Sequence, residues 1–300
     1  MDELALANRF DGERPRLRAV AYRILGSLSE AGDAVQEAWL RLQRTDAEEI
    51  DNLDGWLTTV VARICLNALR TRSRHPEEPL EGFLAEPLVS PATGEDPEYE
   101  ALLSDAVGVA LQVVLETLAP AERVAFVLHD MFAVPFEEIA SLIERSPQAA
   151  RQLASRARQR MQDTAPVPDA DVGAQRAIVD AFFAASRDGD LDALIAVLDP
   201  DVVIRSHHRE QVSEMRGAER VARGALQFRS FAPFVRPAQI NGAAGVVAYD
   251  GEQPFALLAF TVRDGRAVAI DVFNDRELVP KLVRRQSSSR KTTLSTPGPS

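Results

Sequence analysis

The residue types best suited to contacting nucleic acid fall into two rows at helical spacing. The first row follows the turn DNLDG and recurs at i, i+4, i+7 and i+11. Its members are Arg63, Asn67, Arg70 and Arg74. Arginine pairs with phosphate, and arginine and asparagine both make bidentate hydrogen bonds to base edges. An apolar stripe occupies the opposite side, so the row is expected on the exposed side of a helix.

The second row lies on an expected helix that begins at Pro147, with Ser146 as its N-cap. Shorter helices are expected before it over 121–130 and 136–143, with a tight turn over 144–146. The inward positions of the last helix are small or apolar. Its outward positions include Gln148, Arg151, Gln152, Ser155 and Arg158. This is the pattern of a major-groove reading helix, although a helical hairpin with solvent-facing arginines shares it.

A third polar row lies on an earlier helix within the helical stretch expected over 16–74. Asp33, Glu37 and Arg41 recur at i, i+4 and i+8, opposite an apolar stripe. Taken alone, such a row is typical of a solvated helix face. Trp56 lies just before the first arginine row, and taken alone it favours an ordinary core residue.

Length and composition limit what the whole chain can be. The 300 residues allow two to three domains, and 46% apolar with 26% charged residues excludes a wholly disordered chain. The net charge of −11 argues against a uniformly basic nucleic-acid coat, so binding surfaces must be local. No apolar run approaches a membrane span, and the first residues lack the apolar stretch of a secretory signal. A single cysteine, Cys65, excludes an intramolecular disulfide or a multi-cysteine zinc site, and it fits the cytoplasm.

Two breaks divide the chain. Residues 77–100 hold eight acids, four prolines and no lysine or arginine, which indicates an extended linker. The stretch TAPVPDADVG forms a second break, and a Ser/Thr/Pro-rich end indicates a disordered tail. The predicted segments are 1–75, a linker over 76–103, 104–163, a linker over 164–173, 174–284 and a tail over 285–300.

The third segment has a different pattern. A helix is expected over 174–187, and strands over 245–249, 255–263 and 266–273, the last two joined by the hairpin turn VRDGR. Helices followed by an antiparallel sheet indicate an α+β domain.

Three residues of this segment could form an acid–base group in a cavity. Asp271 lies on one side of the last strand, and Arg205 and His207 share a side of the first. We favour the alternative, a structural ion pair or solvent exposure. Adjacent His207 and His208 point to opposite faces of a strand, so no metal site is expected.

The first two segments together resemble an extracytoplasmic-function sigma factor of the sigma-70 family. The strings that carry the resemblance are AYRILGSLSEAGDAVQEAWLRL, GWLTTVVARICLNALRTRSR and LETLAPAERVAFVLHDMFAVPFEEIASLIERSPQAARQLASRARQRM. Their order and spacing match the family's second and fourth domains, both all-α, with the acidic linker where the third domain is missing. Two details depart from the family pattern: the turn over 144–146 lacks glycine, and Ala31-Gly32 replaces a more usual pair.

The resemblance implies roles for the matching residues. The first arginine row matches the region that melts and reads the proximal promoter element, and the second matches the helix that reads the distal element. The residues that match the surface docking on polymerase are Asp33, Gln36, Glu37 and Arg41. Those that match a loop helping to hold a flipped base are Asn52, Asp54 and Trp56.

The third segment resembles a SnoaL-like domain, a cone with a cavity, mainly through the string GDLDALIAVLDPDVV. The whole chain therefore resembles the subgroup of these sigma factors with a fused SnoaL-like domain, which implies that this domain tunes sigma activity. Two motifs expected in the subgroup are altered here, to SHHRE and NDRELV.

The predicted function is promoter recognition and transcription initiation with core RNA polymerase, without enzymatic activity, cofactor or membrane partner. The predicted partners are polymerase and promoter DNA, with an intramolecular contact between the sigma domains and the C-terminal domain. One alternative is a ligand-sensing or enzymatic SnoaL-like protein that its helical half tethers to DNA. Another is a one-component regulator, which would have no use for the row over 33–41.

Overall fold

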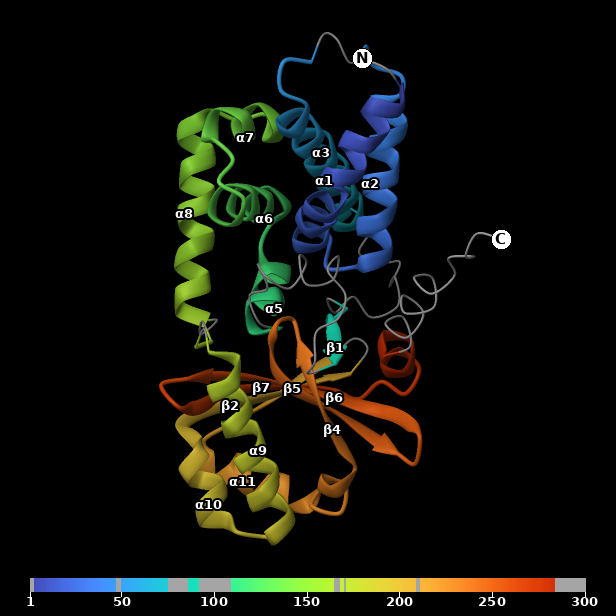
Figure 1. Cartoon of the computed structure of the whole chain (residues 1–300). Coiled ribbons are helices and arrows are strands. Elements are labelled where there is room, and N and C mark those ends of the chain that lie inside the picture. The colour runs from blue at the N-terminus through green and yellow to red at the C-terminus, as the bar shows by residue number, and fades with distance from the viewer. Residues whose placement is uncertain are drawn as a thin grey trace, which may run out of the picture.

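The computed structural model describes residues 3–46, 50–74, 86–91, 109–164, 168–169, 171–208 and 211–283. An all-helical part lies on one side of a mixed sheet, and three helices cover the other side of that sheet (Figure 1). Most of the predicted acidic linker and all of the predicted tail lie outside the described residues. Within the described ranges, no helix is long and apolar enough to cross a membrane.

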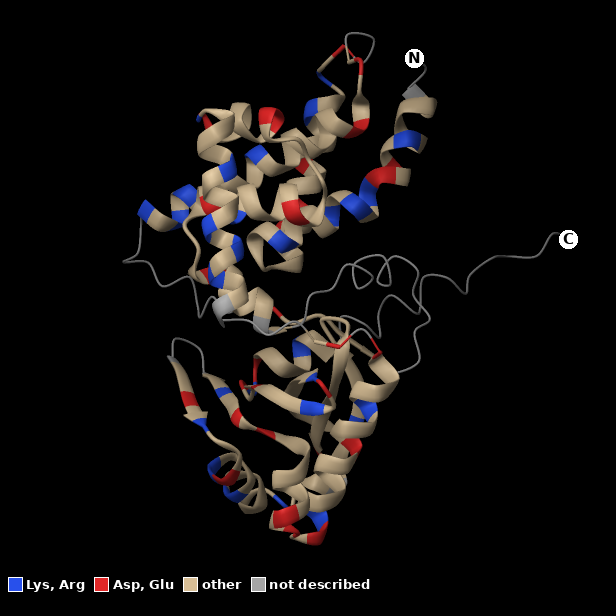
Figure 2. Cartoon of the chain, turned by 90° about the vertical axis from the view of Figure 1, so that its left-hand side faces the viewer, with Lys and Arg blue, Asp and Glu red and all other residues tan. Residues whose placement is uncertain are grey.

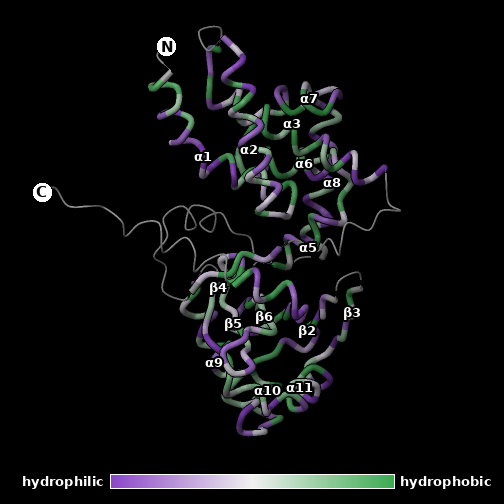
Figure 3. The backbone as a smooth tube through the Cα atoms, turned by 90° about the vertical axis from the view of Figure 1, so that its right-hand side faces the viewer, coloured by the Kyte–Doolittle hydropathy of each residue, from purple (hydrophilic) through white to green (hydrophobic). Residues whose placement is uncertain are grey.

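The first three helices are α1 (Glu3–Leu25), α2 (Leu28–Leu42) and α3 (Leu53–Arg74). Ser27 caps α2, because its side chain accepts a hydrogen bond from the amide of Glu30. Each of these helices buries one apolar side, and polar and apolar segments alternate along them (Figure 3).

The second group comprises α5 (Val109–Thr117), α6 (Pro120–Phe126), the π-helix η2 (Val127–Met131), α7 (Phe136–Ile143) and α8 (Pro147–Thr164). The predicted helices over 136–143 and from Pro147 are confirmed. The helix predicted over 121–130 differs, because its second half winds as the wider π-turn of η2.

Both groups of helices contribute to one hydrophobic core. α3 packs against α6 and α7, and α1 packs against η2. The side chain of Arg123 on α6 is buried at this junction, where its Nη1 donates to the carbonyl of Ile24 at 2.9 Å. Burial lowers the pKa of Arg123 to about 10, so the guanidinium keeps its charge at neutral pH.

The C-terminal part begins with α9 (Val172–Asp188) and α10 (Leu191–Val197). The string RDGDLD explains their junction: Gly189 ends α9 with a φ of 76°, and the Asp190 carboxylate caps α10. The remaining elements are β2 (Leu198–His208), β3 (Gln211–Arg216), α11 (Ala218–Gln227), the short 3₁₀ helix η3 (Ala232–Phe234), β4 (Val235–Ile240), β5 (Ala243–Asp250), β6 (Gln253–Arg263) and β7 (Arg266–Phe273).

The sheet has the order β1-β4-β5-β6-β7-β2-β3. β2 and β7 run parallel, and the other neighbours run antiparallel. The predicted α+β class and the hairpin VRDGR are confirmed: Asp264 and Gly265 both have positive φ, as a tight type I′ turn requires.

The two faces of the sheet pack against different partners. The α9 face carries the helices α9, α10 and α11 over an apolar core. The α5 face carries α5 and the short helix over 278–283 over a second apolar core. α5 thus lies between the upper helices and the sheet (Figure 1).

One strand of the sheet comes from the predicted linker. β1 (Val89–Pro91) pairs antiparallel with β4, in register from Val89 with Ile240 to Pro91 with Ala238. The sequence predicted an extended segment here, and extended backbone is what a sheet edge can accept. The proline content of this segment did not indicate that it pairs with β4, because β4 lies far along the chain.

The turn before α8 generates a stability prediction. Glu144 ends α7 in the left-handed conformation, with φ 59° and ψ 48°, which is strained for a residue with a Cβ. Glu144→Gly should therefore raise the free energy of unfolding by up to about 1 kcal/mol, because glycine adopts positive φ without that strain. Thermal unfolding of the full chain measures this effect. Glu144→Ala keeps the Cβ and should not raise the unfolding temperature; an equal rise for both variants would contradict the prediction.

Candidate DNA and polymerase interfaces

The first arginine row lies on the outward side of α3. Arg63, Asn67 and Arg74 are exposed and Arg70 is half-buried, while the opposite side of α3 lies in the helical core. None of these arginines forms an ion pair with another residue in the part of the chain that the structure describes. Their guanidinium groups are therefore available for phosphates or base edges.

The start of α3 differs from its prediction as a loop. The helix begins at Leu53, and Asn52 acts as its cap, because the Asn52 Oδ1 accepts from the amide of Gly55 at 3.1 Å. Asp54 and Trp56 thus lie in the first turn of the helix. Trp56 is half-buried and packs against the helical core, with part of its side chain open to solvent.

The second row lies along α8. Gln148, Arg151, Gln152, Ser155 and Arg158 are all exposed on this helix, and Ala150, Ala154 and Ala157 are buried on its other side. Basic segments recur along α8 on the side of the molecule that faces the viewer in Figure 2. Two of the arginines already have partners. The guanidinium of Arg158 binds the Asp130 carboxylate, and that of Arg151 lies over the Phe136 ring.

The outward side of α2 carries the predicted polymerase row. Asp33, Gln36 and Glu37 are exposed, and half-buried Arg41 pairs with Glu37. Leu40 lies on the same side, with 44% of its surface exposed. Sequence reasoning missed Leu40, although its position four residues after Gln36 places it in the row. Protein interfaces bury an apolar centre within a polar rim, and Leu40 is the large apolar side chain that this row exposes.

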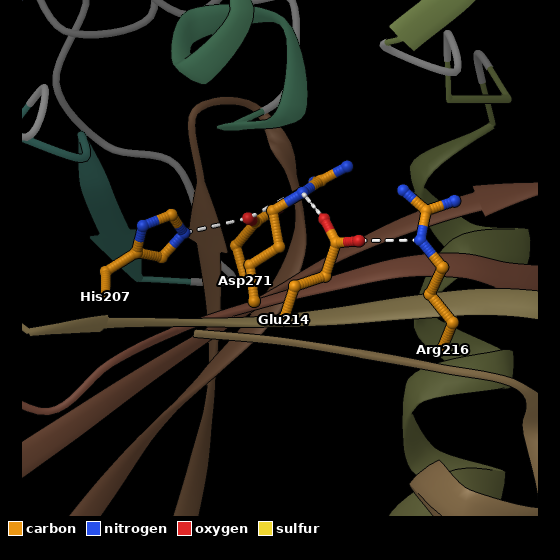
Figure 4. Close-up of polar contacts among 5 residues, drawn as sticks. His207, Glu214, Arg216 and Asp271 are labelled. Atoms are coloured by element: carbon orange, nitrogen blue, oxygen red, sulfur yellow. Dashed lines mark hydrogen bonds and ion pairs between the residues drawn. The ribbon is translucent and has the colours of Figure 1, made fainter. Parts of the chain in front are cut away.

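The predicted acid–base group assembles on the α5 face of the sheet (Figure 4). His207 Nε2 lies 2.9 Å from Asp271 Oδ1, and Arg205 Nη1 lies 3.4 Å from the same oxygen. His207 also stacks on Phe273. Glu214 and Arg216 extend the cluster towards the free edge strand β3.

This cluster does not lie among the helices of the cone. Asp271 is 0% and His207 3% exposed, but Ile270 and Val272 on the same strand point to the opposite, α9 face. There the core is filled by Phe182, Phe183 and Phe260, whose rings pack edge to face. The parallel pairing of β2 with β7 brings Arg205, His207 and Asp271 together. The alternation of side chains along both strands places them on the α5 face, opposite the face that α9, α10 and α11 cover.

Comparison with known proteins gives a consistent result. Residues 10–75 match the model of sigma-70 region 2, and residues 108–161 match that of sigma-70 region 4. The ECF RNA polymerase sigma factor SigJ of Mycobacterium tuberculosis is 37% identical over 285 residues, which cover 89% of this chain and 91% of that protein. The chain belongs to the extracytoplasmic-function sigma factors. The probable sigma factor SigI of the same species is 35% identical and covers 86% of this chain and 89% of its own.

One solved structure is similar to this sigma factor along almost its whole chain. The crystal structure of SigJ from M. tuberculosis matches with a TM-score of 0.72 at 35% identity, covering 91% of this chain and 97% of that one. The predicted family is thereby confirmed, and so is the predicted order of two helical sigma domains followed by an α+β domain, the cone. Sigma factors bind core RNA polymerase and promoter DNA, so these are the partners of this chain.

The sigma helices and the cone of this sigma factor meet at Asn241, in the turn between β4 and β5. Asn241 is buried, and its side-chain Oδ1 accepts a hydrogen bond from the backbone amide of Leu88 at 2.6 Å. The backbone amide of Asn241 in turn donates to the Leu88 carbonyl at 2.7 Å. The hydroxyl of Tyr22 on α1 lies 3.5 Å from the same Oδ1 and donates to the Glu86 carbonyl at 2.7 Å. Burial raises the pKa of the Tyr22 phenol, which therefore stays a donor.

The linker segment is also fastened to the corner between α1 and α2. The amide of Glu86 donates to the carbonyl of Gly26 at 2.8 Å, and the Glu86 carboxylate accepts from the amide of Leu28 at 3.4 Å. We call residues 86–91 with Tyr22 and Asn241 the linker latch. Sequence reasoning missed it. The pair Asn241-Gly242 signals a tight hairpin turn, but no local pattern indicates what that turn would contact.

The latch can be tested with a substitution that keeps its backbone. Asn241 has a φ of 49°, so Asn241→Gly preserves the turn while it removes the acceptor for Leu88. We expect the latch to weaken by about 1–3 kcal/mol, because a buried amide loses its partner. Hydrogen exchange of the peptide that contains Leu88 should then accelerate roughly tenfold or more.

The matched control is Asp264→Gly, which changes another positive-φ turn residue of the same sheet, on the β6–β7 hairpin. This variant should leave the exchange of the Leu88 peptide unchanged. Exchange that stays slow in Asn241→Gly would show that the pairing of β1 with β4 holds the segment without the side chain.

Proposed function

We propose that this sigma factor binds core RNA polymerase through the outward side of α2, reads the proximal promoter element with α3 and reads the distal element with α8. The supporting observation is that the three polar rows of the sequence lie exposed on three separate helices, each backed by the shared core. The protein is expected to act in the cytoplasm, where polymerase meets DNA, and to need no cofactor.

The two DNA-reading domains pack together in this arrangement. α3 contacts α6 and α7 of the other domain, and the buried side chain of Arg123 lies at this junction. Two promoter elements are separate stretches of one duplex, so engaging both requires the domains to move apart. The charge of Arg123 contributes little net stability, because its desolvation offsets its interactions. Apolar contacts and the linker latch therefore supply most of the resistance to opening.

The cone then acts as a regulator of this opening. It holds residues 86–91, which lie between the two sigma domains, through β4 and Asn241. It also packs α5, the first described helix of the second sigma domain, against its α5 face. Any event that loosens either contact lowers the free-energy cost of separating the domains.

We propose that the cone performs no catalysis. In its described part, the buried side chains that could act as acid or base are His207 and Asp271, and both lie under α5 rather than in the helix-covered core. A general acid or base must reach its substrate within hydrogen-bond distance, which the phenylalanine-filled side does not allow. The Asp–His–Arg cluster is then a structural ion pair of the interface.

Polymerase binding tests the proposed role of α2. Leu40→Asp should weaken binding to core polymerase by about tenfold or more, because it places an unpaired charge at the centre of the surface. The matched control is Leu4→Asp on α1, where 69% of the leucine is exposed. Titration of labelled full-length variants with core polymerase measures both. Equal affinity of Leu40→Asp and the natural chain would favour the one-component regulator, which has no use for this surface.

Run-off transcription tests the regulation. With a limiting amount of full-length protein on a promoter selected from genomic fragments, Asn241→Gly should increase the amount of specific transcript, because opening costs less free energy. Asp264→Gly should match the natural chain. Unchanged or reduced output from Asn241→Gly, with the Leu88 peptide exchanging faster, would refute the proposal that the latch restrains initiation.

A further inference from the structure

The strongest unassigned arrangement lies beneath the distal-element helix. We propose that His129 and Asp130, adjacent residues of the π-helix η2, are positioning residues that orient Arg151 and Arg158 of α8 before DNA binds. The proposal rests on the proposed function of α8 and specifies how its base preference arises.

Asp130 determines the direction of Arg158. The carboxylate Oδ1 of Asp130 accepts from Nε of Arg158 at 2.7 Å and also from Nη2. One edge of the guanidinium is therefore occupied by the protein, and the Nη1 side remains for another partner. The carboxylate also neutralises much of the local charge, so Arg158 attracts phosphate less than a free arginine does.

His129 acts on Arg151 through an aromatic ring. The Phe136 ring stacks on the His129 ring with centroids 3.8 Å apart, and the guanidinium carbon of Arg151 lies 5.0 Å from the centroid of the Phe136 ring. His129 is fixed in turn, because its Nδ1 lies 3.1 Å from the Val134 carbonyl, which can only accept. His129, Phe136 and Arg151 thus form a stacked column from η2 through α7 to α8.

The two arginines then have different tasks. Arg151 lies one turn into α8, and reading helices contact base edges with their N-terminal residues. A guanidinium held over a ring by a cation–π contact uses no N–H group in that contact, and guanine presents the two acceptors that match a pair of such groups. Arg158 lies about two turns further along, where a phosphate contact is expected. The column therefore assigns preference for guanine to Arg151, and the Asp130 pair assigns register on the DNA backbone to Arg158.

Fixing these side chains before binding has a thermodynamic consequence. A free arginine loses much rotamer freedom when it binds, and this loss opposes every sequence equally. An arginine that is already held loses less on binding the matching base, but it cannot turn to accommodate a different one. The expected effect of the positioning residues is greater discrimination between bases.

The experiment uses holoenzyme reconstituted from full-length variants and core polymerase. A promoter library carries a fixed proximal element and a randomised distal element, and bound DNA is sequenced. Phe136→Leu should reduce the guanine preference at one distal position roughly tenfold, because Arg151 loses its stacking partner. Phe136→Tyr keeps the ring and should retain the preference.

Asp130→Asn should act differently. It releases the charge of Arg158, so binding to all sequences should tighten, and the slope of log affinity against log salt should steepen by about one unit. The matched control is Glu122→Gln, which removes the neighbouring acid–arginine pair between α6 and α8, where Glu122 Oε2 lies 3.0 Å from Arg160 Nη1. This control also frees an arginine of α8, but Arg160 lies outside the row proposed to meet DNA, so it should lower thermal stability and leave the salt slope and base preference unchanged.

The outcomes separate the proposal from the function on which it rests. If Arg151→Ala and Gln148→Ala both leave the selected distal sequences unchanged, α8 does not read that element and the proposed function of α8 fails. If those variants change the selection while Phe136→Leu and Asp130→Asn match the natural chain, the positioning role alone is overturned.

Discussion

The arrangement of this sigma factor depends on a short piece of extended backbone. Residues 86–91 bond on one side to the α1–α2 corner, through Glu86 and Gly26, and on the other to β4 and Asn241. The segment is the described part of the chain between α3 and α5, and it belongs structurally to the sheet of the cone. Because several of these bonds satisfy buried backbone groups, releasing the segment leaves those groups without partners unless water replaces them.

The second contact between the cone and the sigma helices is made by α5, and it leaves buried polar atoms without hydrogen-bond partners. Under α5, His207 Nδ1 and Asp271 Oδ2 are buried without a hydrogen-bond partner in the described structure, and both amide atoms of Gln112 on α5 share that condition. Unsatisfied buried polar atoms reduce the stability of the surface that buries them. The apolar contacts of Val109 and Phe273 thus hold a contact that its polar residues weaken, as the proposed opening of the domains requires.

Local patterns predicted much of this molecule because its helices and late strands are fixed by their own sequences. Apolar periodicity located α7 and placed the outward rows of α3 and α8, and Asp264-Gly265 specified a hairpin. Strand alternation correctly placed Arg205 and His207 on one side of their strand, but it does not say which face of the sheet the helices cover. The latch, the π-turn of η2 and the partners of Arg151 and Arg158 depend on contacts between distant segments, and no local period encodes such contacts. The charge rows reveal which residues face outward, and tertiary structure decides which of them are already engaged.

The pairing of β1 with β4 also has a consequence for solubility. β4 is an edge strand of the cone once residues 86–91 leave it, and its row of amides and carbonyls would then face water. Exposed edges of this kind template pairing with other chains. The linker therefore acts as a protective cover for the sheet as well as a connection between domains. A sigma factor that opened in the absence of polymerase would expose the unpaired edge of β4 to other chains. Selection against aggregation would therefore favour opening that is coupled to polymerase binding.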